Sequence, residues 1–169
     1  GMGVLVFLIA LLPSAGNIQM NLMRAESPGP SVTRLTPTVR STAKTLYGIY
    51  IFMTIVEIIF LLAGGMPLFD ALTTTFGTAG TGGFGIKNDS IASYSTYIQV
   101  VVTVFMILFG INFNIYFLIL AKKWKQALKS EELKWYLITI GAAMFLIAWD
   151  IRMLYGSFGE ALQQSAFQV

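Results

Sequence analysis

Four long stretches of this sequence carry almost no charge, and this feature restricts the chain to folds that can exist in a lipid bilayer. They are residues 2–23, 45–66, 90–121 and 135–149, and the one Asp, Glu, Lys or Arg within them is Glu57. A helix needs about 20 mostly apolar residues to cross a bilayer. We therefore predict four helical segments, the last extended by residues 150–155 near an interface. With 56% hydrophobic and 11% charged residues, the composition favours an all-α membrane protein over a soluble domain.

The Lys and Arg residues gather in two of the connections between these stretches. Nine lie in residues 24–44 and 122–134, and two, Lys87 and Arg152, lie on the other side. Because cytoplasmic loops carry the excess of basic residues, both connections are predicted to be cytoplasmic. The loop between the second and third stretches then enters the membrane from outside. The net charge of +3 is read as this topology signal, so no nucleic-acid partner is expected.

The residue inventory excludes several classes of function. The sequence has no Cys and no His, which rules out disulfides, thiolate chemistry, Cys or His metal sites and a Ser-His-Asp arrangement. We expect neither an enzyme nor a bound cofactor. No basic region precedes the first stretch, so no signal peptide is expected.

The connection between the second and third stretches contains a glycine-rich segment, Thr-Ala-Gly-Thr-Gly-Gly-Phe-Gly at residues 78–85. It contains the Thr-x-Gly-aromatic-Gly pattern whose backbone carbonyls replace the water shell of K⁺ in channel filters. Unpaired peptide groups cannot face lipid, so the segment must be buried in protein or line a wet cavity. We predict a re-entrant filter loop with carbonyl donors at Thr81, Gly82, Gly83 and Phe84. Gly83 is expected to be the least replaceable of them.

A short pore helix is predicted before this loop, starting after Pro67 with Asp70 in its first turn. A carboxylate at that position complements the helix dipole. The free carbonyls at the other end of the helix place partial negative charge toward the middle of the membrane, where a cation has lost its hydration. Together these features predict a cation pore with K⁺ as the permeating ion.

Other interpretations fit parts of this pattern. Residues 80–85 also match G-x-G-x-x-G, but a dinucleotide site requires a preceding strand and an acid about 20 residues later, where this chain has an uncharged stretch. The glycines would also suit simple close packing of helices. Two further functions stay as alternatives: a non-conducting membrane scaffold or assembly subunit, and a secondary transporter of another solute with a re-entrant loop, which would predict inverted repeats.

Polar residues inside the stretches have several expected roles. Glu57 is protonated, paired with Arg152 or directed at the pore. Asn112 and Asn114 cannot both face the same way, so at least one is expected to bond to a neighbouring helix. Two glycines are expected to permit a close helix crossing or a bend: Gly48 and Gly110.

Matching residues flank the second and fourth stretches. Lys44 and Asp70 are 26 residues apart, as are Lys134 and Glu160, and Asp-Ala-Leu at 70–72 matches Glu-Ala-Leu at 160–162. These matches predict a repeat of 90 residues in parallel orientation, which weighs against inverted repeats. The next filter-like loop would fall near position 171, so the sequence is expected to be a fragment of a longer chain.

The predicted organisation is a series of helix–pore helix–helix repeats. Residues 1–23 form the second helix of a preceding repeat, 24–44 a cytoplasmic connector, 45–121 one complete repeat, 122–134 a cytoplasmic basic loop, and 135–169 the first helix and the start of the pore helix of the next repeat.

The connector Arg-Ala-Glu-Ser-Pro-Gly-Pro at 24–30, the loop at 78–85 and the repeat length together resemble the membrane subunit of the bacterial Trk/Ktr potassium uptake family, of the TrkH type, over essentially the whole chain. The resemblance implies four tandem repeats in one polypeptide around a pseudo-fourfold axis, each donating a filter strand with a central glycine, here Gly83. It also implies a multi-pass homodimer in the bacterial inner membrane. Its partners would be the remaining repeats of the parent chain, the lipid bilayer and a cytosolic nucleotide-binding regulatory subunit, for which residues 122–134 are a candidate contact.

Overall fold

The computed structural model describes residues 39–83 and 85–169. Within these residues the chain is helical and contains no strand, and two of its helices have the length and apolar composition of membrane spans. The predicted all-α membrane fold is therefore confirmed. The predicted first span, the connector up to residue 38 and Phe84 lie outside the described residues.

Seven helices follow one another along the described chain. They are α3 (Val39–Ala63), α4 (Leu68–Ala79), α5 (Thr96–Gly110), α6 (Phe113–Leu120), α7 (Trp124–Leu128), α8 (Glu131–Ile151) and α9 (Phe158–Gln168). α3 and α8 are each long and apolar enough to cross a membrane. α5 and α6 reach that length only together, as a pair of helices bent by 89°. The fourth predicted span thus begins four residues earlier than expected, and the basic loop contains a short helix.

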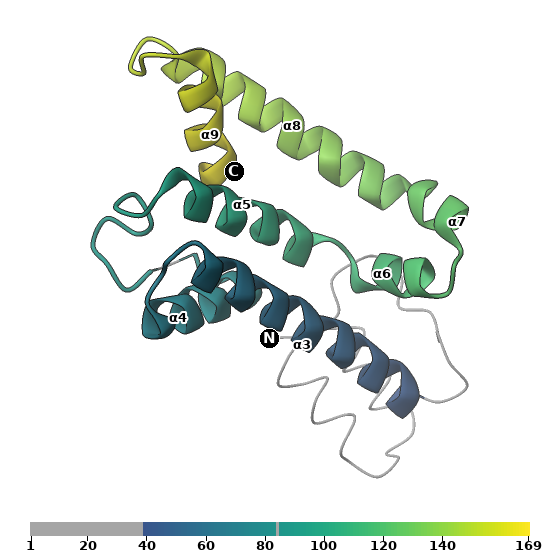
Figure 1. Cartoon of the computed structure of the whole chain (residues 1–169). Helices are drawn as coiled ribbons and strands as arrows, with labels where there is room; N and C mark the ends of the chain where they lie inside the picture. Colours follow the sequence, from purple (N-terminus) through teal and green to yellow (C-terminus); the bar gives the residue numbers. More distant parts are fainter. Residues whose placement is uncertain (1–38, 84) are drawn as a thin grey trace.

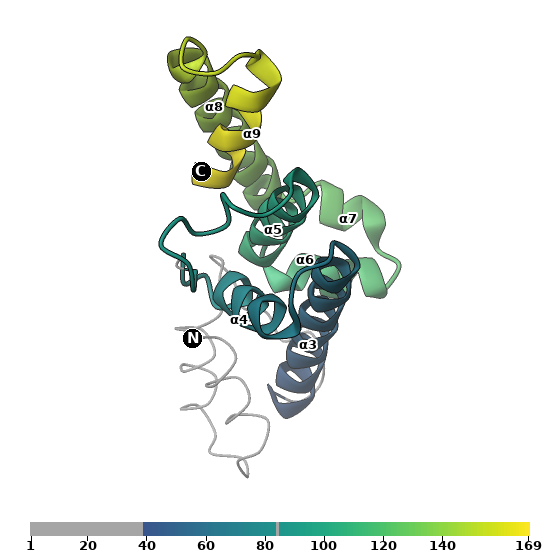
Figure 2. The same cartoon turned by 60° about the vertical axis from the view of Figure 1, so that its left-hand side comes forward.

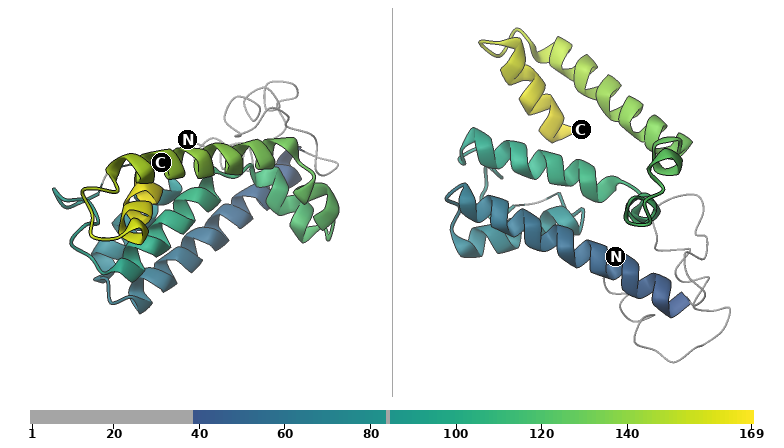
Figure 3. Two further views of the ribbon diagram at one scale, coloured as in Figure 1. Left: turned by 90° about the horizontal axis from the view of Figure 1, so that it is seen from above. Right: turned by 45° about the vertical axis from the view of Figure 1, so that its right-hand side comes forward.

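The long helices lie side by side with alternating directions, and the short helices α4 and α9 fold back along them. α3 and α8 run one way and α5 runs the other way between them (Figures 1 and 3). Each short helix returns beside the end of the long helix that precedes it, α4 beside α3 and α9 beside α8. Figure 2 shows α4 and α3 as neighbours below α5. A re-entrant helix therefore follows each of the two qualifying spans.

α3 ends at a pair of glycines, Gly64 and Gly65. Gly65 has φ +81°, and its N–H donates to the Leu62 carbonyl at 3.0 Å while the N–H of Met66 donates to the Leu61 carbonyl at 3.1 Å. These two bonds form a Schellman motif, in which a left-handed residue closes the helix. The turn leads directly into Pro67 and α4, which begins at Leu68.

The third uncharged stretch, predicted as one helical segment, is broken in the structure. Ile111 is extended, with φ −73° and ψ 138°, and Asn112 caps the new helix α6 by accepting a hydrogen bond from the Asn114 N–H at 3.0 Å. An Asn side chain competes well for backbone donors, which favours a helix start at this position. The lack of charged residues predicted the length of this apolar stretch, but it did not predict the break within it.

Two tyrosine hydroxyls bond to carbonyls of α5 at the break, where the Leu108 carbonyl also accepts the Ile111 N–H at 3.2 Å. Tyr136 of α8 donates to the Ile107 carbonyl at 3.0 Å, and Tyr116 of α6 donates to the Leu108 carbonyl at 2.6 Å. An unsatisfied carbonyl costs several kcal/mol in a bilayer. The two tyrosines therefore make the bend compatible with a membrane.

Gly48 and Gly110, the two glycines expected to permit a close helix crossing or a bend, have different surroundings. At Gly110 an added Cβ would overlap the Tyr136 hydroxyl, so α8 approaches α5 closely there, beside the break. At Gly48 an added Cβ would meet no atom of the described residues within 4 Å. Gly110 thus fulfils the expectation, and no close crossing is found at Gly48 within the described part of the chain.

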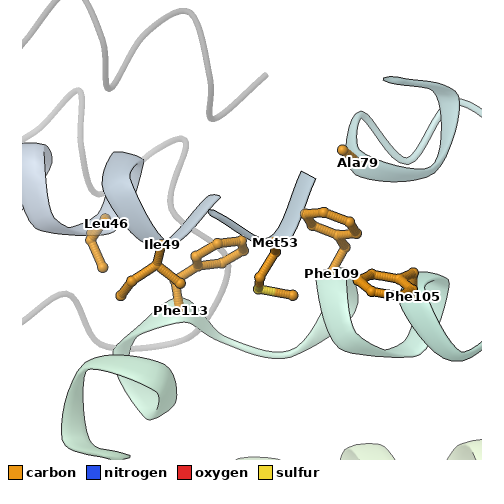
Figure 4. Close-up of a cluster of buried hydrophobic side chains, with 7 residues drawn as sticks. All are labelled: Leu46, Ile49, Met53, Ala79, Phe105, Phe109 and Phe113. Carbon is orange, nitrogen blue, oxygen red and sulfur yellow. The ribbon is translucent and has the colours of Figure 1, made fainter. Parts of the chain in front are cut away.

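A cluster of buried apolar side chains joins α3 to the end of the pore-helix candidate α4 (Figure 4). Its members come from α3, α4, α5 and α6: Leu46, Ile49, Met53, Ala79, Phe105, Phe109 and Phe113. Because lipid tails are as apolar as these side chains, the cluster stabilises the fold through close packing rather than removal from water. Its place in the fold fixes the last residue of α4, where the glycine-rich loop begins.

Candidate functional site

The N-terminus of α4 is anchored through Asp70. This acid lies in the first turn of the helix, and Tyr94, in the loop before α5, donates a hydrogen bond to its carboxylate. Burial, followed by this hydrogen bond, raises the pKa of the Tyr94 hydroxyl, so the tyrosine keeps its proton at neutral pH. The Lys87 ammonium lies 3.9 Å from the centre of the Tyr94 ring. A carboxylate at this end of the helix complements its dipole.

The C-terminus of α4 closes with a second Schellman motif. Thr81, with φ +52°, takes the left-handed position, and its N–H donates to the Thr78 carbonyl at 3.1 Å while the Gly82 N–H donates to the Gly77 carbonyl at 2.8 Å. The sequence predicted free carbonyls at this end. Two of them are instead used by the loop, because the chain turns sharply rather than leaving the helix in an extended strand.

The next residues of the loop alternate in backbone conformation. Thr81 and Gly83 have positive φ, +52° and +70°, whereas Gly82 between them does not. A positive φ strains any residue that has a side chain, whereas glycine adopts it freely. The Thr81 hydroxyl donates to the Gly80 carbonyl at 2.8 Å. Phe84, the fourth predicted carbonyl donor, lies outside the described residues.

The glycine-rich loop lines a pocket of about 530 Å³ together with the end of α9. Thr78, Thr81 and Gly83 lie on one side, and residues 166–169 lie on another. α5 and α8 complete the lining with Val102, Met106, Ile107, Tyr136 and Ile140. The C-terminal ends of two short helices therefore meet at one cavity.

α9 begins in the same way as α4. It begins at Phe158, ninety residues after the start of α4, and carries Glu160 in its first turn as α4 carries Asp70. Ser157 caps it by accepting a hydrogen bond from the Glu160 N–H at 3.2 Å. The two helices thus enter the fold with an acid at the same position.

Polar contacts that no sequence pattern predicted connect these parts. The Gln163 amide of α9 donates to the Gln99 side-chain oxygen of α5 at 3.0 Å, and the Gln99 amide donates to the Tyr94 carbonyl at 3.0 Å. Gln99 is a lone polar residue in an apolar run, which was the one available signal. The expectation that Asn112 or Asn114 bonds to a neighbouring helix is confirmed, since Asn112 donates to Glu132 of α8 at 3.0 Å.

The expected pairing of Glu57 with Arg152 is not found in the described chain. The Arg152 guanidinium lies 4.0 Å from the centre of the Trp149 ring. Glu57 is fully buried in α3, and neither of its oxygens has a hydrogen-bond partner among the described residues. The pairing therefore fails because the arginine remains at the exposed end of α8.

The described residues hold no cluster of three or more His, Cys, Asp or Glu side chains suited to a metal ion. The pocket is lined in part by Thr74, Thr78 and Thr81, whose side chains carry hydroxyl oxygens.

Comparisons with known proteins agree on one group of transporters. Residues 1–151 match the family described as TrkH, a cation transport protein. The whole chain is 33% identical to the Trk system potassium uptake protein TrkH of Salmonella typhimurium and covers 36% of that protein. Over 119 residues it is 37% identical to the TrkH protein of Halomonas elongata, covering 69% of this chain and 25% of that protein.

A more distant similarity extends to archaea. An uncharacterized cation transporter of Methanocaldococcus jannaschii is 30% identical over 132 residues, covering 78% of this chain and 27% of that protein. The chain spans about a third of the length of the Salmonella relative.

Proposed function

The chain belongs to the TrkH family of cation transport proteins, a family of membrane transporters and not of enzymes, and from this premise we propose that it is part of a potassium transporter in which residues 78–85 supply one of four selectivity-filter strands. The observation that carries the proposal is the pocket lined jointly by the glycine-rich loop and the end of α9. Repeats placed around one axis bring the ends of their pore helices together at the pore.

In this proposal the carbonyls of Thr81, Gly82, Gly83 and Phe84 face permeating K⁺, and no cofactor takes part. The positive φ of Gly83 supports a strand whose backbone takes conformations that glycine allows, as a filter with its carbonyls turned toward one axis requires. Asp70 holds the outer end of the pore helix through the helix dipole and the Tyr94 hydroxyl.

The division of the chain follows the repeat. Residues 45–121 are one complete unit, 1–23 close the preceding unit, and 135–169 begin the next, while 24–44 and 122–134 are cytoplasmic connections. The start of α9 ninety residues after that of α4 supports this division.

The proposed setting is the bacterial inner membrane, which the full-length protein crosses several times. The remaining repeats of the parent chain close the pore, and the apolar side chains exposed on α8 suit lipid or those repeats. We assign a homodimer and a cytosolic nucleotide-binding regulator as further partners, the latter at the basic residues 122–134. Five lysines in this segment would attract an acidic surface.

The test is Gly83→Ser in the full-length transporter, with Gly65→Ser as the matched control. Both glycines have positive φ, and at either position an added Cβ meets no atom of the described residues within 4 Å. Both changes therefore impose similar backbone strain, roughly 1–2 kcal/mol. Gly83→Ser is expected to lower the ratio of Rb⁺ to Na⁺ flux into proteoliposomes, whereas Gly65→Ser should leave it unchanged. Equal ratios in both variants would show that the loop does not select the ion.

A further inference from the structure

A buried acid of α3 has no partner in the described chain. Glu57 is 0% exposed, and both of its carboxyl oxygens lack a hydrogen bond among residues 39–83 and 85–169. Burying a polar group without a partner is costly, and burying an unpaired charge is far more so. An acid retained at such a position needs a physical reason.

Glu57 faces the end of α4. α3 and α4 pack against each other, and the Thr78 hydroxyl lies beside the Glu57 carboxyl without completing a hydrogen bond to it. Thr75, three residues before Thr78 and so on the same side of α4, is also 0% exposed, and its hydroxyl has no hydrogen-bond partner among the described residues. α4 thus carries a second buried polar group one turn before Thr78.

Thr78 connects this contact to the glycine-rich loop. Its hydroxyl donates to the Thr74 carbonyl at 3.0 Å, and its carbonyl accepts the N–H of Thr81 at 3.1 Å. Thr78 also lines the pocket, together with Thr81 and Gly83. A change in the position of Thr78 is therefore passed to Thr81, the first of the predicted carbonyl donors.

The surroundings favour an uncharged carboxyl group at Glu57. The last turn of α4 carries the negative end of the helix dipole, which repels a carboxylate. A neutral carboxylic acid can instead donate its proton to the Thr78 oxygen, which still has a lone pair to accept it because the Thr78 proton is directed at Thr74.

We propose that Glu57 is a positioning residue for the ion-selective loop, acting as a neutral hydrogen-bond donor to Thr78 at the end of the pore helix. This inference rests on the proposed function of the same loop. Glu57 does not touch the ion, since it is fully buried and is not among the residues that line the pocket. The alternative, a carboxylate that binds the cation, makes the opposite prediction for a neutral replacement.

The experiment measures the ratio of Rb⁺ to Na⁺ flux in the full-length transporter. Glu57→Gln keeps the shape and a neutral donor, so the ratio should stay within about twofold of the wild type. Glu57→Leu removes the donor and should lower the ratio about fivefold, the scale of one lost hydrogen bond. Thr78→Val removes the acceptor, and the double variant Glu57→Leu/Thr78→Val should be no worse than either single change.

Thr54→Val is the matched control. Thr54 is a buried threonine of α3, 8% exposed, whose hydroxyl bonds within its own helix, to the Tyr50 carbonyl at 2.8 Å. It should leave the flux ratio unchanged. If Glu57→Leu does not reach the membrane, a normal flux ratio in Thr78→Val still overturns the inference, because that variant exchanges for a methyl group the hydroxyl that Glu57 is proposed to contact.

Two results overturn the inference and leave the proposed function intact. One is a normal flux ratio in Thr78→Val or Glu57→Leu while Gly83→Ser still lowers it. The other is a Glu57→Gln variant as impaired as Glu57→Leu, which would assign the charge to ion binding. A wild-type protein that shows no preference between Rb⁺ and Na⁺ would reject the proposed function itself.

Discussion

Thr81 holds a backbone conformation that a β-branched residue rarely adopts. Three helices, α3, α4 and α6, end with the same pair of hydrogen bonds, and the left-handed position is Gly65 in the first, Thr81 in the second and Lys122 in the third. A non-glycine residue there costs roughly 1–2 kcal/mol. Since glycine serves at the end of α3, capping alone does not require a threonine in α4. Strain retained at a candidate site points to a role in that site.

Replacing Thr81 and Lys122 by glycine should separate the effect of helix capping from the effect on ion selectivity. Lys122→Gly and Thr81→Gly should each raise the free energy of unfolding of the full-length protein by about 1 kcal/mol, measured as a higher melting temperature in detergent. Lys122→Gly should keep the Rb⁺ to Na⁺ flux ratio, and Thr81→Gly should lower it because a more mobile residue begins the filter strand. An unchanged ratio in Thr81→Gly would argue against a role for this strain in selectivity.

Single residues were predictable from the sequence to different degrees. The loop glycines were identified because their spacing reports a backbone requirement, and the acid at Asp70 because helix starts favour one. The left-handed φ of Thr81 was not, because threonine gives no signal for that conformation. For Glu57 the sequence left three roles open, and the pairing with Arg152 is the one that the described structure contradicts, since separation along the sequence says nothing of distance in space.

At the scale of the helix, the break between α5 and α6 depends on a different element. Gly110 and Asn112 were visible in the sequence as a possible bend and a polar contact, yet the hydroxyl that satisfies the Ile107 carbonyl comes from Tyr136 of α8. No periodic pattern connects a tyrosine of one span to the carbonyl of another. The angle of 89° between α5 and α6 therefore could not be predicted from the sequence. A straight span and a broken span have the same length of apolar sequence.

Gly110→Ala should destabilise this bend. The new methyl group would overlap the Tyr136 hydroxyl, so α8 must shift and the hydrogen bond to Ile107 weaken, which lowers the free energy of unfolding by roughly 1–3 kcal/mol. Gly141→Ala in α8 is the control, since its methyl group meets no atom within 4 Å. Melting temperatures of the full-length protein report both changes.

A double variant checks that the overlap is the cause. In Tyr136→Phe the hydroxyl is absent, so Gly110→Ala should cost less in that background than in the wild type. Equal costs in the two backgrounds would show that Gly110 is needed for helix geometry rather than for the approach of α8.

For the whole molecule, the repeat was the part of the architecture that the sequence revealed best. Equal spacing of Lys44 to Asp70 and of Lys134 to Glu160 anticipated that α4 and α9 would start ninety residues apart, because each acid marks the first turn of a short helix. The link from Gln163 of α9 to Gln99 of α5 was not anticipated, since the repeat predicts equivalent elements and not the contacts between them.

Potassium should stabilise the full-length transporter through the filter. Thr78, Thr81, Gly83 and Gly85 line part of the pocket, so several strands are needed to enclose an ion. An ion bound by the folded protein alone adds about 2.7 kcal/mol at one hundred times its Kd. Replacing Na⁺ by K⁺ at constant ionic strength should therefore raise the melting temperature of the wild type and of Gly65→Ser. In Gly83→Ser the rise should shrink or vanish, because the strand no longer presents its carbonyls. A rise of the same size in Gly83→Ser would mean that the stabilising ion binds elsewhere in the protein.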